Sequence, residues 1–135
     1  MAKQVLSHVD IRVRDRERAV AFYDGILGAL GHTREQSEQW VTYDASGERD
    51  DAQTHVWFGF TVDVDMTPGP TRIAFAADSC EEVDRVTVAA LEIGARHVEG
   101  PEYAYGPDYY AVFFEDPDGN KLEVCCYGPK AGAAS

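Results

Sequence analysis

The stretch YYAVFFEDPDGNKLEVCC, residues 109–126, decides the fold because it joins two strand-forming runs through a turn. Residues 110–115 are largely aromatic or branched, as strands favour, and residues 122–127 resume that character. Between them, Asp-Pro-Asp-Gly at 116–119 supplies turn chemistry. The sequence therefore predicts a β-hairpin at this point of the chain.

Alternation along the second strand of this hairpin separates two faces. Leu122, Val124 and Cys126 share one face, which we expect to meet the core. Glu123 lies on the opposite face, where a carboxylate near the middle of a sheet must be solvated, paired or bound to a ligand. Glu123 is therefore a candidate functional residue.

The composition predicts a single domain over residues 1–135, since 44% of the residues are hydrophobic and suffice for a core. The formal net charge of -12 opposes binding to nucleic acid and to anionic membranes. The three cysteines are odd in number and lack metal-ligand spacing, and no apolar stretch reaches transmembrane length. We therefore expect a cytoplasmic protein with reduced thiols and a flexible tail at 128–135.

The same order of predicted elements occurs twice. Module one, about residues 5–61, is expected to contain a strand at 5–13, a helix from Asp15 to Gly31, and strands at 32–36, 39–43 and 54–61. After a connector at 62–70, module two, about residues 71–127, is expected to contain a strand at 71–77, a helix ending at Gly94, a strand at 96–99 and the hairpin. The spacing from Asp15 to Gly31 equals that from Asp78 to Gly94, which favours an internal duplication.

These elements predict an α+β fold of two βαβββ modules. Each module is expected to form part of a curved, partly open mixed sheet, with its helix on the convex side and its polar concave face towards a cleft. Strand parity predicts which side chains line that cleft: His8, Asp10, Arg12, His55, Trp57, Arg72, Ala74, Glu123 and Cys125.

Three segments carry a family resemblance: HVDIRVRDRERAVAFYDGILGALG (8–31), TRIAFAADSCEEVD (71–84) and FFEDPDGNKLEV (113–124). The chain resembles, over nearly its whole length, the vicinal oxygen chelate superfamily. That superfamily includes glyoxalase I, fosfomycin-resistance thiol transferases, extradiol dioxygenases and bleomycin-resistance proteins. The resemblance implies paired βαβββ modules, a homodimer, and a divalent metal held in the cleft by His and Glu.

Carried over residue by residue, the resemblance puts His8 at the first-strand ligand position and Glu123 at the last-strand carboxylate position. The fifth strand departs from the pattern, because Arg72 stands where the family commonly has His, and a guanidinium does not coordinate metals. His55 lies close to where glyoxalase I-like members place an additional Glu. His8, His55 and Glu123 would form a ligand set that suits iron, manganese, zinc or nickel.

The first hypothesis is therefore a metal-dependent lyase or dioxygenase of the glyoxalase/dioxygenase type, acting on a small molecule. Arg72 would bind the negative charge of the substrate, and Tyr109 would donate or accept a proton. The cleft forms either within one chain or across a swapped homodimer. In the swapped dimer, His8 and His55 come from one subunit and Arg72 and Glu123 from the other.

The second hypothesis is a metal-free binding protein that resembles bleomycin-resistance proteins. Arg72 would pair with Glu123 in the vacated metal position. A flat or cationic small molecule would then bind through aromatic candidates and one carboxylate, aided by the negative net charge: Trp57, Tyr105, Tyr109, Tyr110 and Asp10. A third alternative is a dimeric scaffold without a ligand, so the sequence leaves open whether the protein is an enzyme.

Overall fold

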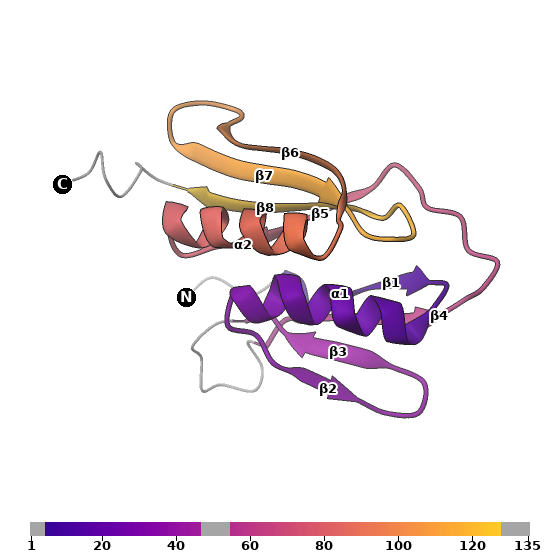
Figure 1. The fold of residues 1–135 in the computed structure, drawn as a ribbon. Coiled ribbons are helices and arrows are strands. Elements are labelled where there is room, and N and C mark those ends of the chain that lie inside the picture. Colours follow the sequence, from indigo (N-terminus) through magenta and orange to yellow (C-terminus); the bar gives the residue numbers. More distant parts are fainter. Residues whose placement is uncertain (1–4, 47–54, 128–135) are drawn as a thin grey trace.

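The computed structural model describes residues 5–46 and 55–127, and the predicted tail at 128–135 lies outside them. The predicted order of one strand, one helix and three strands occurs twice (Figure 1). Module one contains β1 (His8–Val13), α1 (Arg16–Ala29), β2 (Arg34–Gln36), β3 (Val41–Asp44) and β4 (Trp57–Val62). Module two contains β5 (Arg72–Ala76), α2 (Cys80–Glu92), β6 (Arg96–Tyr103), β7 (Tyr109–Glu115) and β8 (Lys121–Tyr127).

The two modules have the same sheet topology. The strand order is β1-β4-β3-β2 in one four-stranded sheet and β5-β8-β7-β6 in the other. In each sheet the first strand pairs parallel with the last, and the remaining pairs are antiparallel. This repeated topology confirms the α+β fold of two βαβββ modules with open, mixed sheets.

The two helices lie on the same side of the two sheets (Figure 1), and α1 contacts α2. Side chains cap both N-termini: Asp15 accepts a hydrogen bond from the backbone N–H of Arg18, and Ser79 accepts one from that of Glu82. The predicted capping box is complete, because the Glu82 carboxylate accepts from the backbone N–H of Asp78. Within the described residues, no helix is long and apolar enough to cross a membrane.

Some strand boundaries differ from the predictions. β1 begins at His8 rather than Val5, and β4 begins at Trp57, three residues after the predicted start at Thr54, which lies outside the described residues. β6 continues to Tyr103 instead of ending at Glu99, because it pairs with β7 along its length through two register shifts. Residues 5–7 and 55–56 therefore precede their strands.

One buried apolar cluster contains side chains from both modules. Phe58 of β4 and Phe75 of β5 meet edge to face, with ring centroids 5.0 Å apart. Phe22 of α1 lies 6.3 Å from Phe114 of β7. The predicted core face of β8 is confirmed, since Leu122 and Val124 are fully buried and Cys126 nearly so.

The turn between β7 and β8 also ties module two to module one. The fully buried carboxylate of Asp116 accepts a hydrogen bond from the Tyr23 hydroxyl of α1, 2.6 Å away. Arg14 and Arg18 donate to the carboxylate of Asp118 at 3.3 and 2.7 Å. Gly119 completes the turn at φ 91°, a conformation that glycine adopts without strain. The predicted hairpin is confirmed, and its turn also holds α1 in place.

Candidate functional site

Glu123 is a buried carboxylate on the sheet face opposite the core side chains of β8. It is only 4% exposed and accepts a hydrogen bond from the Tyr109 hydroxyl on the neighbouring strand. No Lys, Arg or His of the described segments lies within ion-pair distance of it. Burying a carboxylate without an ion pair lowers the stability of the fold. This cost indicates that Glu123 has a role beyond packing.

Aromatic rings surround this carboxylate. The Tyr109 ring lies 5.1 Å from that of Tyr105 and 4.9 Å from that of Tyr127, and Tyr105 also lies 6.4 Å from Phe113. Burial raises the pKa of Tyr109 well above its ordinary value, and the neighbouring Cys125 and Glu123 raise it further. Tyr109 is therefore a neutral hydrogen-bond donor at physiological pH. Its hydroxyl donates to the Glu123 carboxylate, and its role in proton transfer stays a prediction.

Arg72, the residue that replaces the family's fifth-strand His, does not pair with Glu123. Its Nη1 donates to the backbone carbonyl of Leu122 at 2.8 Å, and its guanidinium lies 5.1 Å from the centre of the Phe113 ring. The bidentate ion pair expected in the metal-free hypothesis is therefore not formed. Arg72 instead lies over an aromatic ring and is exposed.

The structure gives Tyr110 and Cys125 smaller roles on the Glu123 face than the sequence predicted. Tyr110 follows Tyr109 on the same strand, so it points to the opposite face, where its hydroxyl donates to Asp84 of α2 at 2.6 Å. Cys125 shares the face of Glu123 but is buried, and burial raises the pKa of its thiol although Tyr109 acts in the opposite direction. Cys125 is therefore an inert thiol at neutral pH.

On module one, the predicted first-strand residues lie on an exposed sheet face. The His8 side chain is 65% exposed, and its Nε2 lies 4.0 Å from the Asp10 carboxylate. Asp10 in turn pairs with Arg12 at 2.7 Å. Within one chain His8 belongs to the other sheet from Glu123.

His55 is held by module one and does not join His8 and Glu123. Its Nδ1 contacts the carboxylate of Asp44, which also accepts hydrogen bonds from the backbone and hydroxyl of Ser46. The imidazole stacks on Trp57 at a centroid distance of 5.8 Å. The Nδ1 atom of His55 is thus engaged by Asp44, and the role of His55 as a metal ligand stays a prediction.

The donors of the described segments do not form a metal site. Among residues 5–46 and 55–127, no three His, Cys, Asp or Glu side chains converge on a point where they would coordinate one. Glu123 is engaged by Tyr109, His55 by Asp44, and Arg72 contributes a cation in place of a ligand. A complete set would need donors from beyond residues 5–46 and 55–127 of one chain.

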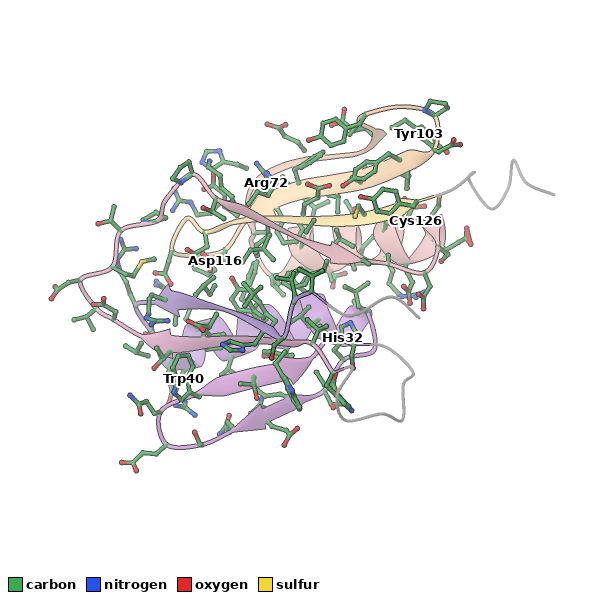
Figure 2. All side chains as sticks on the ribbon, turned by 180° about the vertical axis from the view of Figure 1, so that it is seen from behind. His32, Trp40, Arg72, Tyr103, Asp116 and Cys126 are labelled. Carbon is green, nitrogen blue, oxygen red and sulfur yellow. The ribbon has the colours of Figure 1, made fainter. Side chains whose placement is uncertain are left out.

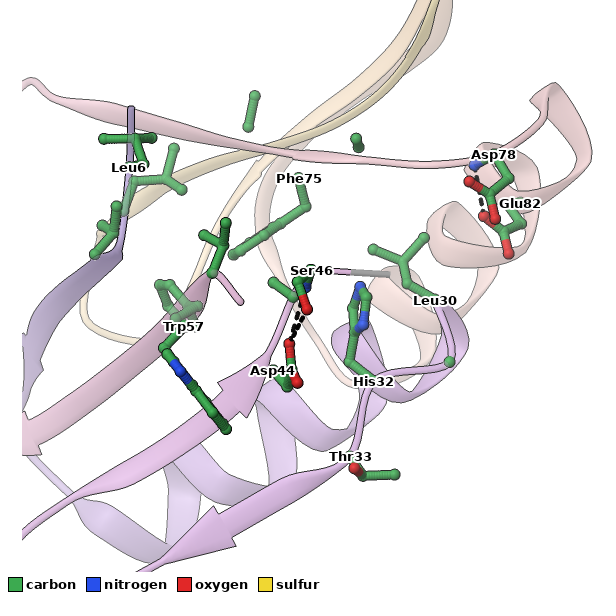
Figure 3. Close-up of a pocket in the computed structure, with 18 residues that line it drawn as sticks. Leu6, Leu30, His32, Thr33, Asp44, Ser46, Trp57, Phe75, Asp78 and Glu82 are labelled. Carbon is green, nitrogen blue, oxygen red and sulfur yellow. Dashed lines mark hydrogen bonds between the residues drawn. The ribbon is translucent and has the colours of Figure 1, made fainter. Parts of the chain in front are cut away.

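A cleft of about 970 Å³ lies between the two modules (Figure 3). We call it the intermodule cleft. It is lined by Leu6, Val9, Leu30, Gly31, His32, Thr33, Asp44, Ala45, Ser46, Val56, Trp57, Phe58, Ile73, Ala74, Phe75, Ala76, Asp78 and Glu82. The Phe75 ring projects from β5 between the modules, with Asp44 and Ser46 on the module-one side and Asp78 and Glu82 at the start of α2 (Figure 3).

Of the residues predicted to line a cleft, only Trp57 and Ala74 line this one. The lining also contains Asp44, Asp78 and Phe75, none of which was predicted to face a cleft. Figure 2 shows the predicted Arg72 on module two and His32, which lines the observed cleft, on module one. Only the relative placement of the modules brings the lining together, and no local sequence pattern reports it.

A family model described as Glyoxalase/Bleomycin resistance protein/Dioxygenase superfamily matches residues 5–124. A glyoxalase/bleomycin resistance protein from Albidiferax ferrireducens T118 is 30% identical in sequence, with a TM-score of 0.75, covering 90% of this chain and 98% of that one. The metallothiol transferase FosB of Lysinibacillus sphaericus (strain C3-41) is 25% identical over 128 residues, 91% of this chain and 82% of that protein. The fosfomycin resistance protein FosX of Listeria monocytogenes, solved with Mn(II) and sulfate, shares the fold at 17% identity and a TM-score of 0.64, covering 97% of this chain and 94% of that one.

Proposed function

Because the chain belongs to the Glyoxalase/Bleomycin resistance protein/Dioxygenase superfamily, we propose that it binds a small aromatic cation in the intermodule cleft without a metal. One observation carries the proposal: the described lining of the cleft contains three carboxylates and neither Lys nor Arg. These carboxylates belong to Asp44, Asp78 and Glu82. A cavity with this charge attracts cations and repels anions.

The walls of the cleft favour a flat, apolar ring. Trp57, Phe58 and Phe75 line it together with aliphatic side chains, and its volume is at the upper end of the roughly 300–1,000 Å³ typical of small-molecule sites. Aromatic rings also attract cations through their negative faces, most strongly in Trp. An aromatic ring with a positively charged substituent would satisfy both the walls and the acidic residues.

Asp44 is the best-defined counter-ion for such a ligand. Burial acts to raise the pKa of Asp44, but hydrogen bonds from Ser46 and His55 outweigh it, and the pKa lies below its ordinary value. The carboxylate therefore stays ionised at neutral pH and at mildly acidic pH. Glu82 is less available, because it already accepts from the Asp78 backbone and contacts Arg85 at 3.6 Å.

The test uses three compounds that share one ring: 1-naphthylmethylammonium, 1-naphthalenemethanol and 1-naphthoate. We expect calorimetric titration to show saturable binding of the cation, weaker binding of the alcohol and none of the anion. Asp44→Asn should weaken cation binding about fivefold, the effect of losing one partly exposed charge pair, and leave the alcohol unaffected.

Asp63→Asn is the matched control, because Asp63 is an exposed carboxylate outside the cleft lining. We expect it to bind the cation as the unmodified protein does. Binding of 1-naphthoate as strong as that of the ammonium compound, or equal cation affinity in Asp44→Asn and Asp63→Asn, would overturn the proposal.

The second candidate is a metal-dependent enzyme of the glyoxalase/dioxygenase type whose site is shared by two copies of the chain. It is favoured by the exposed His8 on one module and by Glu123 on a face of the other, and by the metallothiol transferase FosB and the Mn(II)-bound FosX among the similar proteins. Within such a homodimer His8 of one copy would meet Glu123 of the other. Arg72 would bind an anionic substrate there, and Tyr109 would move a proton.

Metal content separates the two candidates. For the cleft-binding function we expect elemental analysis of untagged protein, after incubation with manganese, iron, zinc and nickel salts, to find less than one metal per chain. A stoichiometric metal that is lost in both His8→Ala and Glu123→Ala would instead establish the second candidate. Recovery of metal on mixing these two variants would show that two copies share the site.

A further inference from the structure

A second, smaller pocket of about 220 Å³ lies on the sheet of module two. We call it the Arg72 pocket. It is lined by Arg72, His97, Glu99, Phe113, Phe114, Glu115 and Lys121, and shares no lining residue with the intermodule cleft. All four strands of the sheet contribute to it.

The backbone of β6 is irregular where it forms one wall of this pocket. Its pairing with β7 shifts register on both sides of Glu99. His97 has a φ of 51°, the left-handed region that residues other than glycine adopt at a cost. Bulges and strained residues of this kind gather at binding sites, where they re-aim side chains.

The Glu115 carboxylate has two basic neighbours in the pocket. Lys121 lies 3.5 Å from the carboxylate of Glu115, and His97 lies 3.9 Å from the same carboxylate. The other two charged groups are Arg72 and Glu99. They form no ion pair with each other or with any other side chain of the described segments. The pocket thus holds one cation and one carboxylate that are separate and unpaired.

Phe113 fixes the position of these two charges. The Arg72 guanidinium rests on its ring at 5.1 Å, and one of its nitrogens is held by the carbonyl of Leu122. A guanidinium has five N–H donors in a rigid fork, so most of the fork is left for a ligand. Glu99 is the β6 partner of Phe113 in the strand register, so the two side chains leave the same face of the sheet.

From this juxtaposition we infer that the Arg72 pocket binds a small zwitterion of the α-amino acid type. The ligand carboxylate pairs with the fork of Arg72, and its ammonium group pairs with Glu99. A simple anion would be repelled by Glu99, and a simple cation would be repelled by Arg72. A ligand that carries both charges can pair with both groups.

The test follows two-dimensional NMR spectra, because binding to so small and open a pocket is expected to be weak. We expect L-alanine to give saturable shifts at the Arg72 Nε–H and at the backbone amides of Glu99 and Phe113. N-acetyl-L-alanine, which lacks the ammonium, and L-alaninamide, which lacks the carboxylate, should each bind about fivefold more weakly or worse.

Arg72→Gln and Glu99→Gln should each reduce L-alanine affinity by a similar factor, and the spectra report at once whether each variant is folded. Glu102→Gln, which changes an exposed carboxylate of the same strand outside the pocket, should not change it. If Arg72→Gln is unfolded, Arg72→Lys serves in its place and should also weaken binding, because it loses the fork. Affinity of N-acetyl-L-alanine equal to that of L-alanine, or no saturable shift with L-alanine, would contradict the inference, whichever ligand the intermodule cleft prefers.

Discussion

Asp116→Ala is expected to lower the free energy of unfolding by about 4 kcal/mol, because it strands several buried donors at once. The carboxylate accepts four hydrogen bonds: from the Tyr23 hydroxyl at 2.6 Å, the backbone N–H groups of Asp118 and Asn120 at 2.9 Å, and the Asn120 side chain at 2.8 Å. It is fully buried. Alanine offers none of these donors an acceptor, and the Tyr23 hydroxyl and the Asp118 N–H would be left in buried surroundings.

Urea-induced unfolding at neutral pH measures this effect as a shift of the midpoint with an unchanged slope. Asp65→Ala is the control, since Asp65 is exposed and its side chain has no hydrogen-bond partner among the described residues. Its effect should stay within about 0.5 kcal/mol. A loss below about 1 kcal/mol in Asp116→Ala would mean that the turn does not hold the modules together as its contacts indicate.

The case of Asp116 shows what the sequence could and could not predict. Its Asp-Pro-Asp-Gly context predicted the turn, because turn chemistry is local. The contact with Tyr23 spans 93 positions in the sequence, and no local pattern reports it. The alternation that assigned Leu122 and Val124 to the core was equally reliable, because the side-chain period of a strand is fixed at two.

The candidate site was less predictable for the same physical reason. Parity placed Glu123 on the face opposite the core, and the same rule applied to β7 would have separated Tyr109 from Tyr110, the next residue along the strand. The ligand role of His55 rested on a strand beginning at Thr54, whereas the described β4 begins at Trp57 and His55 contacts Asp44. The intermodule cleft is lined by residues of both modules, so its lining depends on how the modules pack.

Glu123→Gln is expected to raise the free energy of unfolding by about 2 kcal/mol at neutral pH. The unmodified side chain carries a carboxylate into a site that is 4% exposed, with one hydrogen bond from Tyr109 and no ion pair within the described residues. Glutamine keeps an oxygen that accepts from Tyr109 and removes the charge that burial penalises. Its volume is nearly the same, so the surrounding aromatic rings need not move.

Glu115→Gln is the matched control on the same hairpin. Glu115 is an ion-paired carboxylate, 3.5 Å from Lys121 and 3.9 Å from His97, and losing these partly exposed pairs should cost up to about 1 kcal/mol. The two substitutions make the same chemical change. They are nevertheless expected to shift the urea midpoint in opposite directions, because Glu115 is ion-paired and Glu123 is buried without an ion pair. The difference between the two changes in the free energy of unfolding separates the effect of burying an unpaired charge from the effect of the amide substitution itself.

The sign of the effect decides what Glu123 is for. Natural proteins accept losses of stability at functional sites. If an uncharged residue of the same shape is more stable at position 123, we infer that Glu123 is retained for binding or chemistry. Stabilisation in Glu123→Gln would therefore mark the Tyr109–Glu123 face as a second functional surface beside the intermodule cleft. A loss of more than about 1 kcal/mol would instead make Glu123 a structural acceptor for Tyr109, and the search for function would concentrate on the cleft and the Arg72 pocket.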